Sequence, residues 1–89
     1  MRYAWDPAKA ASNLRKHGVS FEEAVSALED PNAIEIVDVD QDDEMRLRVL
    51  AWSPRGRVLF VVRVERESDT SRIISARIAT KREAKLYDD

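Results

Sequence analysis

The chain has 89 residues, of which 44% are hydrophobic and 36% are charged, and its formal net charge at pH 7 is −2. This length predicts a single domain over residues 1–89, with one modest core, because so small a domain buries only about 60% of its unfolded surface. The absence of cysteine and the presence of one histidine exclude disulfides, thiolate metal sites and histidine-rich metal sites. The two glycines cannot form a glycine-rich phosphate loop, so we expect no metal and no cofactor.

The charged residues are unevenly distributed. Seven acidic residues and no basic residue lie between Asp30 and Glu44, whereas eleven basic residues stand against four acidic ones between Met45 and Tyr87. A basic half of this kind can bind a polyanion, usually nucleic acid, although a solvated sheet face balanced by an acidic loop is the alternative. The sequence starts without an apolar run typical of a signal peptide, and no stretch approaches membrane-spanning length. We therefore expect a soluble cytoplasmic protein that does not bind membranes.

A first helix is predicted after a brief strand that residues 2–5 could form. Asp6-Pro7 is typical of an N-cap followed by the first helical residue, and Gly18 suits a left-handed C-cap. The helix is therefore expected over residues 7–16. Lys16-His17 then lies at its negative end, where cations are favourable without any further role.

A second helix and a set of strands should follow. A capping box at residues 20–23 begins the helix, and Asp30-Pro31 ends it. Alternating or continuous apolar residues then predict four strands, over residues 33–39, 45–49, 57–64 and 71–78.

A short basic helix completes the predicted fold. Thr80-Lys81-Arg82-Glu83 forms another capping box, and the helix that it begins should end near Tyr87. The expected fold class is therefore α+β, with two N-terminal helices, an antiparallel meander of about four strands and a short C-terminal helix.

Arginines on the predicted strands are the most suggestive candidates for a binding site, because a guanidinium donates two hydrogen bonds to phosphate and keeps its charge. The five are Arg46, Arg48, Arg63, Arg72 and Arg77. In a regular final strand Arg72 and Arg77 point to opposite faces, and only a bulge could bring them together. For any one arginine the alternative is a cross-strand ion pair, for example Arg72 with Glu65.

The residues also permit RNA cleavage without a metal, in which the substrate's own 2′-hydroxyl is the nucleophile. The protein then needs only to accept that proton, stabilise charge on phosphorus and help the 5′-oxygen to leave. Arg, Lys, His, Glu and Tyr can fill these roles, and all of them are present.

Three segments together resemble the BrnT family of type II toxins: "WDPAKAASNLRKHGVSFEEA", "RVLFVVRVERE" and "RIISARIATKREAKLY". The resemblance extends from about Tyr3 to Tyr87. It implies a fold similar to RelE-type ribonuclease toxins and a ribosome-independent endoribonuclease that inhibits translation. It further implies neutralisation, in a hetero-oligomer, by a BrnA-type antitoxin with a ribbon-helix-helix region. That complex would repress its own operon and contact operator DNA through the antitoxin.

The family motifs fall on residues that we expect to be structural and on residues that we expect to be catalytic. Trp5 is assigned to the core rather than to base stacking. The predicted catalytic residues are Lys16, His17, Arg46, Arg77 and Tyr87. Arg77 would bind the scissile phosphate with help from Arg46, and His17 is the first candidate for proton transfer.

Two other classes of function stay open. The chain could be a non-catalytic subunit that binds a partner within a transcriptional repressor complex, or a non-catalytic RNA-binding domain. The second lacks the clustered aromatic residues that a stacking platform needs. The net negative charge is unusual for an enzyme that acts on RNA, and the acidic run at 38–44 could be a surface loop or a docking site for a basic antitoxin segment.

Overall fold

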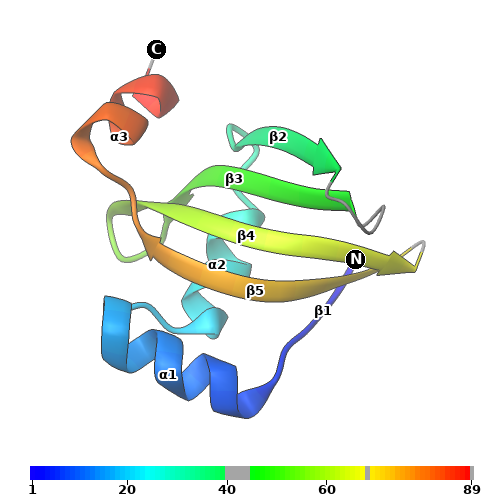
Figure 1. The fold of residues 1–89 in the computed structure, drawn as a ribbon. Helices are drawn as coiled ribbons and strands as arrows, with labels where there is room; N and C mark the ends of the chain where they lie inside the picture. Colours follow the sequence, from blue (N-terminus) through cyan, green and yellow to red (C-terminus); the bar gives the residue numbers. More distant parts are fainter. Residues whose placement is uncertain (40–44, 68, 89) are drawn as a thin grey trace.

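A mixed β-sheet with helices around it forms the structure, a computed structural model that describes residues 1–39, 45–67 and 69–88 (Figure 1). The elements in chain order are β1 (Arg2–Ala4), α1 (Pro7–His17), α2 (Phe21–Leu28), β2 (Ile34–Val39), β3 (Met45–Ser53), β4 (Arg57–Glu67), β5 (Thr70–Ile78) and α3 (Lys81–Asp88). The α+β class is as predicted. Most of the expected acidic loop, residues 40–44, lies outside the described residues.

The sheet has the strand order β1-β5-β4-β3-β2. Strands β2 to β5 form the antiparallel meander that the sequence predicted. The sheet has one strand more than the expected four or so, because the brief strand expected at residues 2–5 forms over Arg2–Ala4 as β1 and joins the sheet parallel to β5. Three residues are too few to show a period of two, and the partner strand lies at the far end of the chain.

The helix termini are formed as their cap residues predict. Asp6 accepts a hydrogen bond from the Ala8 N–H (2.9 Å), and Ser20 accepts one from the Glu23 N–H (3.0 Å). Gly18 has φ of +69° and donates its N–H to the Leu14 carbonyl (2.9 Å), which places it at the left-handed C-cap position. Short-range chemistry therefore sets where α1 and α2 begin and where α1 ends.

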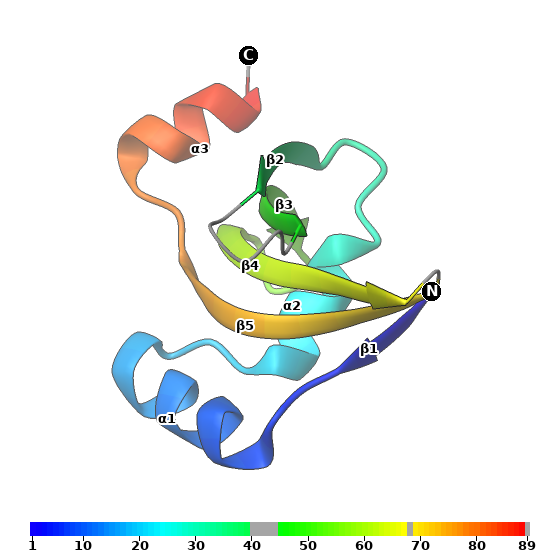
Figure 2. The same cartoon turned by 45° about the vertical axis from the view of Figure 1, so that its right-hand side comes forward.

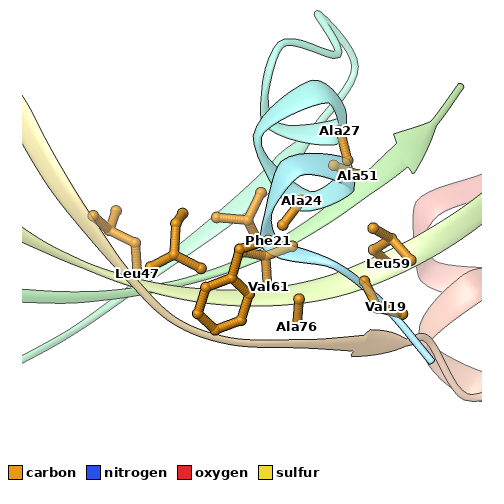
Figure 3. Close-up of a cluster of buried hydrophobic side chains, with 11 residues drawn as sticks. Val19, Phe21, Ala24, Ala27, Leu47, Ala51, Leu59, Val61 and Ala76 are labelled. Atoms are coloured by element: carbon orange, nitrogen blue, oxygen red, sulfur yellow. The ribbon is translucent and has the colours of Figure 1, made fainter. Parts of the chain in front are cut away.

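The core lies between α2 and one face of the sheet (Figure 3). Phe21, Ala24 and Ala27 of α2 are fully buried against strand residues that include Leu59 and Val61. Trp5 packs at the margin of this core, edge-on to Phe21 with 5.9 Å between ring centroids. The assignment of Trp5 to the core is therefore confirmed.

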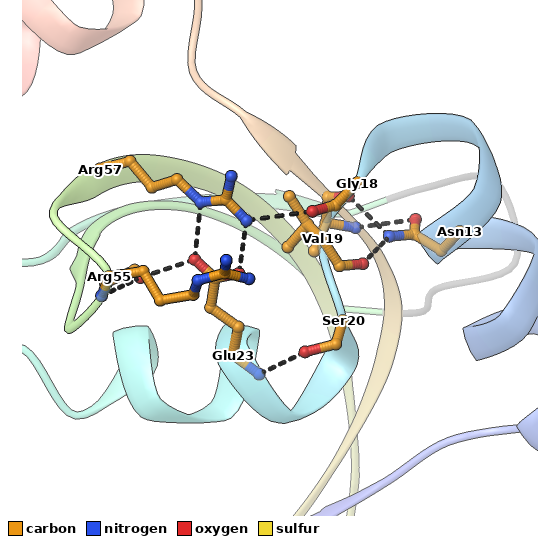
Figure 4. A network of polar contacts seen from close by, with 9 residues as sticks. Asn13, Gly18, Val19, Ser20, Glu23, Arg55 and Arg57 are labelled. Carbon is orange, nitrogen blue, oxygen red and sulfur yellow. Dashed lines mark hydrogen bonds and ion pairs between the residues drawn. The ribbon is translucent and has the colours of Figure 1, made fainter.

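Helix α1 lies along β5 and is connected to it by one buried side chain (Figures 1 and 2). Asn13 donates to the carbonyl oxygens of Val19 (2.9 Å) and Ala76 (2.7 Å) and accepts from the Ala76 N–H (3.1 Å). It therefore satisfies both backbone groups of a β5 residue that has no neighbouring strand on that side, since β1 pairs only as far as Arg72. Figure 4 shows these bonds.

A second polar network connects the start of α2 to the β3–β4 turn (Figure 4). The Glu23 carboxylate is 8% exposed and accepts hydrogen bonds from the Ser53 hydroxyl (2.6 Å) and from Arg57 Nε and Nη2 (2.8 and 2.6 Å). Arg57 also donates to the Gly18 carbonyl (3.0 Å). The hydrogen bonds from Arg57 lower the pKa of Glu23, so the group stays ionised where it is buried.

Candidate functional site

The face of the sheet opposite α2, which we call the outer face, carries four of the five strand arginines. Its three cross-strand rows, in the order β3, β4, β5, are Arg46–Val64–Arg72, Arg48–Val62–Ser75 and Leu50–Phe60–Arg77. Residues opposite each other in an antiparallel pair share a face. The neighbouring positions Val49, Val61 and Ala76 belong to the core, so these rows point the other way.

A bulge in β5 brings Arg72 and Arg77 to the same face. Val62 pairs with Ser75 and the next residue, Arg63, pairs with Ile73, so Ile74 is an extra residue. The strand is therefore not regular, and the bulge that the sequence analysis named as the one way to bring the two arginines together is present. An irregularity that depends on pairing with β4 leaves no mark in the sequence of β5 alone.

Arg63 lies on the core side of the sheet and is only 5% exposed. It binds Glu35 (2.7 Å), Glu65 (3.3 Å) and the Ser71 hydroxyl (3.0 Å). The suggested pair between Arg72 and Glu65 does not form, because Arg72 lies opposite Val64 and Glu65 points to Arg63. Arg63 is thus a structural residue, whereas the other four arginines share a surface.

Arg77 is held in place by α3. Its Nη1 and Nη2 donate to the two carboxylate oxygens of Glu83 (2.8 and 2.9 Å), and its guanidinium carbon lies 4.2 Å from the centroid of the Phe60 ring. The hydrogen bonds from Arg77 lower the pKa of Glu83 to about 2. A phosphate that approaches this fork has to share it with Glu83 or displace that carboxylate.

Lys16 and His17 line a cavity of about 220 Å³ between α1 and the edge of β5. The remaining lining residues are Lys9, Ser12, Asn13, Ile74 and Ser75. Lys9, Lys16 and His17 are exposed, so their side chains face solvent at the cavity. Ser75 belongs to the outer face as well, so the cavity and the arginine rows meet at the bulge.

Tyr87 lies apart from both groups of cations. Its hydroxyl donates to the Asp30 carboxylate, which also accepts from the Trp52 N–H (2.9 Å). The bond to Asp30 raises the pKa of Tyr87 to about 12, so its hydroxyl stays protonated at neutral pH. This contact fixes the C-terminal part of α3 near the end of α2.

The structure thus brings Lys16 and His17 together at the cavity, which is not lined by Arg46, Arg77 or Tyr87. Arg46 and Arg77 share a face, but their β4 partners Val64 and Phe60 are four residues apart, which is about 13 Å along a strand.

Sequence reasoning missed several residues of this surface as site residues. Arg48 and Arg72 were noticed only as strand arginines. Lys9 lies in a segment that carries the family resemblance but was not assigned to the site, and no local pattern distinguished Ser12 or Ser75. Helical spacing from Lys9 to Ser12, Asn13 and Lys16 is the one signal that could have found the α1 side of the cavity.

Among the described residues, no group of three or more His, Cys, Asp or Glu side chains could hold a metal ion. Within the same part of the chain, the helices are all too short or too polar to cross a membrane.

A small α+β domain with a basic sheet face is typical of a protein that binds polyanions. Residues 5–83 match the family described as the ribonuclease toxin BrnT of type II toxin–antitoxin systems, and the chain belongs to this family. The resemblance found in the sequence is therefore confirmed. Membership of a toxin–antitoxin family implies an antitoxin partner.

A solved structure with a similar fold is the 1.1 Å crystal structure of the Brucella abortus ribonuclease toxin BrnT. The two chains align with a TM-score of 0.63 and 24% sequence identity, over 91% of this chain and 99% of the Brucella one. No curated protein matches the sequence.

Proposed function

We propose that the chain is a metal-independent, ribosome-independent endoribonuclease that inhibits translation by cleaving RNA in the cytoplasm. A BrnA-type antitoxin with a ribbon-helix-helix region neutralises it in a hetero-oligomer, which represses its own operon and contacts DNA through the antitoxin. The observation that carries the proposal is the position of four arginines on one sheet face that meets a cavity with two lysines and a histidine.

The residues of the cavity suit the proton transfer that the reaction needs, and those of the outer face suit the stabilisation of charge on phosphorus. The 2′-oxygen attacks phosphorus, the bond to the 5′-oxygen breaks, and the products are a 2′,3′-cyclic phosphate and a 5′-hydroxyl. His17 accepts the 2′-proton, and Lys16 beside it stabilises the 5′-oxygen as it leaves. That oxygen takes up a proton from water to become the 5′-hydroxyl.

Arg77 stabilises the charge that develops on phosphorus, and Arg46 binds the backbone further along the same face. Tyr87 is a positioning residue in this scheme. It acts through α3, because its bond to Asp30 and the pair between Arg77 and Glu83 hold that helix against the sheet.

The test is cleavage of an RNA oligonucleotide in EDTA by the purified wild type and by two variants that break the same ion pair. Arg77→Ala removes the cation, whereas Glu83→Gln leaves it in place and releases it from the carboxylate. We expect Arg77→Ala to lose at least about tenfold in rate, since removing one transition-state hydrogen-bond donor costs about 10²–10³ in known sites. Glu83→Gln should keep most of the activity. Equal losses in both variants would show that Arg77 only anchors α3.

His17→Ala, compared with Arg15→Ala on the same helix, tests proton transfer. Both residues are exposed on α1, but only His17 lines the cavity. We expect a loss confined to His17→Ala. A folded wild type that leaves RNA intact would instead support the non-catalytic subunit of a repressor complex.

A further inference from the structure

Val64, at the end of the outer face away from Arg77, is only 1% exposed although it lies outside the core cluster. Its neighbours in the row are Arg46 on β3 and Arg72 on β5. We propose that Arg46 and Arg72 form a second phosphate-binding site across Val64, and that single-stranded RNA runs along β4 from this site to Arg77. This inference rests on the proposed function, because it names the form of the substrate and a second contact to it.

The geometry of the row suits one phosphate. Two strand spacings separate the backbones of Arg46 and Arg72, about 10 Å, and an arginine side chain from each side can span half of that distance. The burial of Val64 is what we expect where long side chains lie across an apolar residue and hold their charged ends above it. The two guanidiniums can then contact the same anion from opposite sides.

Arg72 is better placed than Arg77 to take a phosphate in the free protein. Both terminal nitrogens of Arg77 already bind Glu83. Within the described residues, the guanidinium of Arg72 has no hydrogen bond and no ion pair. No described residue occupies its five N–H donors, and a guanidinium binds phosphate through two parallel hydrogen bonds.

The spacing of the rows favours one extended nucleic-acid strand. Successive outer-face positions of β4 (Val64, Val62, Phe60) are two residues apart, which is about 7 Å, close to the separation of neighbouring phosphates in an extended strand. The three rows therefore offer Arg46 with Arg72, then Arg48 with Ser75, then Arg77 to successive phosphates.

The bulge at Ile74 makes this site possible. Without the extra residue, β5 would keep a strict alternation and Arg72 would point to the opposite face from Arg77. The same bulge places Ser75 at the cavity that holds Lys16 and His17. One irregularity in the strand thus aligns the second site with the residues proposed for the chemistry.

The test measures binding separately from cleavage. A fluorescent single-stranded RNA with 2′-O-methyl groups, which removes the nucleophile, is titrated with wild type, Arg72→Gln and Arg15→Gln at several salt concentrations in EDTA. Arg15→Gln is the matched control, because Arg15 is an exposed arginine of α1 outside both the outer face and the cavity.

We expect Arg72→Gln to weaken binding at least fivefold and to reduce the slope of log K against log salt by about 0.7, the value for one phosphate contact on a single strand. Arg15→Gln should have the same affinity and the same salt slope as the wild type. Arg72→Lys, which keeps the charge and most of the side-chain stem, should restore most of the slope and rule out misfolding as the cause. A duplex of the same sequence should bind more weakly than the single strand.

Two results would overturn the inference while the proposed function stands. One is that the wild type binds and cleaves RNA while Arg72→Gln has the same RNA affinity and salt dependence as Arg15→Gln. The other is that the duplex binds as tightly as the single strand. A folded wild type that neither binds nor cleaves RNA overturns the proposed function together with this site.

Discussion

Replacing Asn13 with leucine should destabilise the protein by about 3 kcal/mol, because the asparagine is the buried connection between α1 and β5. Its side chain is 7% exposed and makes three hydrogen bonds, to the Val19 carbonyl and to both backbone groups of Ala76. Leucine has a similar size but no polar atoms. The substitution leaves three backbone groups without partners while it fills the same space.

The magnitude follows from those three groups. A buried polar group without a partner costs about 1–3 kcal/mol, and water in the adjacent cavity, which Asn13 lines, can satisfy part of the loss. About 1 kcal/mol for each group gives a total of about 3 kcal/mol. A chain of 89 residues has a total stability of about 4–13 kcal/mol, so the variant would lose a large part of it.

Equilibrium unfolding in urea measures the effect. With a slope near 1.2 kcal/mol per M, the midpoint should fall by about 2.5 M. Ser12→Ala is the control, since Ser12 lines the same cavity but its side chain makes no hydrogen bond to another described residue. It should change stability by less than about 0.5 kcal/mol. An Asn13→Leu loss below about 1 kcal/mol, or a stable variant that no longer cleaves RNA, would refute the structural role.

Other substitutions test the caps and ion pairs. The pKa of Glu83 is lowered from 4.5 to about 2, so its pair with Arg77 stabilises the folded state above pH 4.5, and this contribution disappears as pH falls toward 2. Allowing for the partial exposure of the pair, the free energy of unfolding of the wild type should be about 1–2 kcal/mol larger than that of Glu83→Gln at pH 7. Urea unfolding should show the gap closing below pH 4.5, and a gap independent of pH would contradict the assignment. Glu23→Ala leaves Arg57 without its partner and should cost about 2–3 kcal/mol by urea unfolding, whereas a loss under about 1 kcal/mol would show that water replaces the pair. Gly18→Ala, at φ +69°, should lower the melting temperature by about 4–8 °C for about 1 kcal/mol of backbone strain, and an unchanged value would show that the cap relaxes.

The helices could be predicted closely because their signals are local. The N-cap side chains of Asp6 and Ser20 bind backbone N–H groups two and three residues further along the chain. Gly18 is at its predicted cap, and the predicted end of α1 was one residue short of His17. These contacts involve neighbours that the sequence itself displays.

The sheet could be predicted only in part, because its details depend on distant partners. The meander followed from apolar patterning, whereas the parallel pairing of β1 with β5 joins the two ends of the chain. The face on which Arg72 lies depends on one extra residue opposite β4. A one-residue change of register reverses every later side chain in a strand, so the candidate site was the part most sensitive to what the sequence could not show.

Strand β2, the last in the strand order, has consequences for how copies of the chain meet at high concentration. Its free edge has six residues without lysine or proline, and Ile36 and Val37 are 49% and 55% exposed. An edge of this kind can pair with a second sheet. Concentrated solutions are therefore where edge-to-edge aggregation should begin.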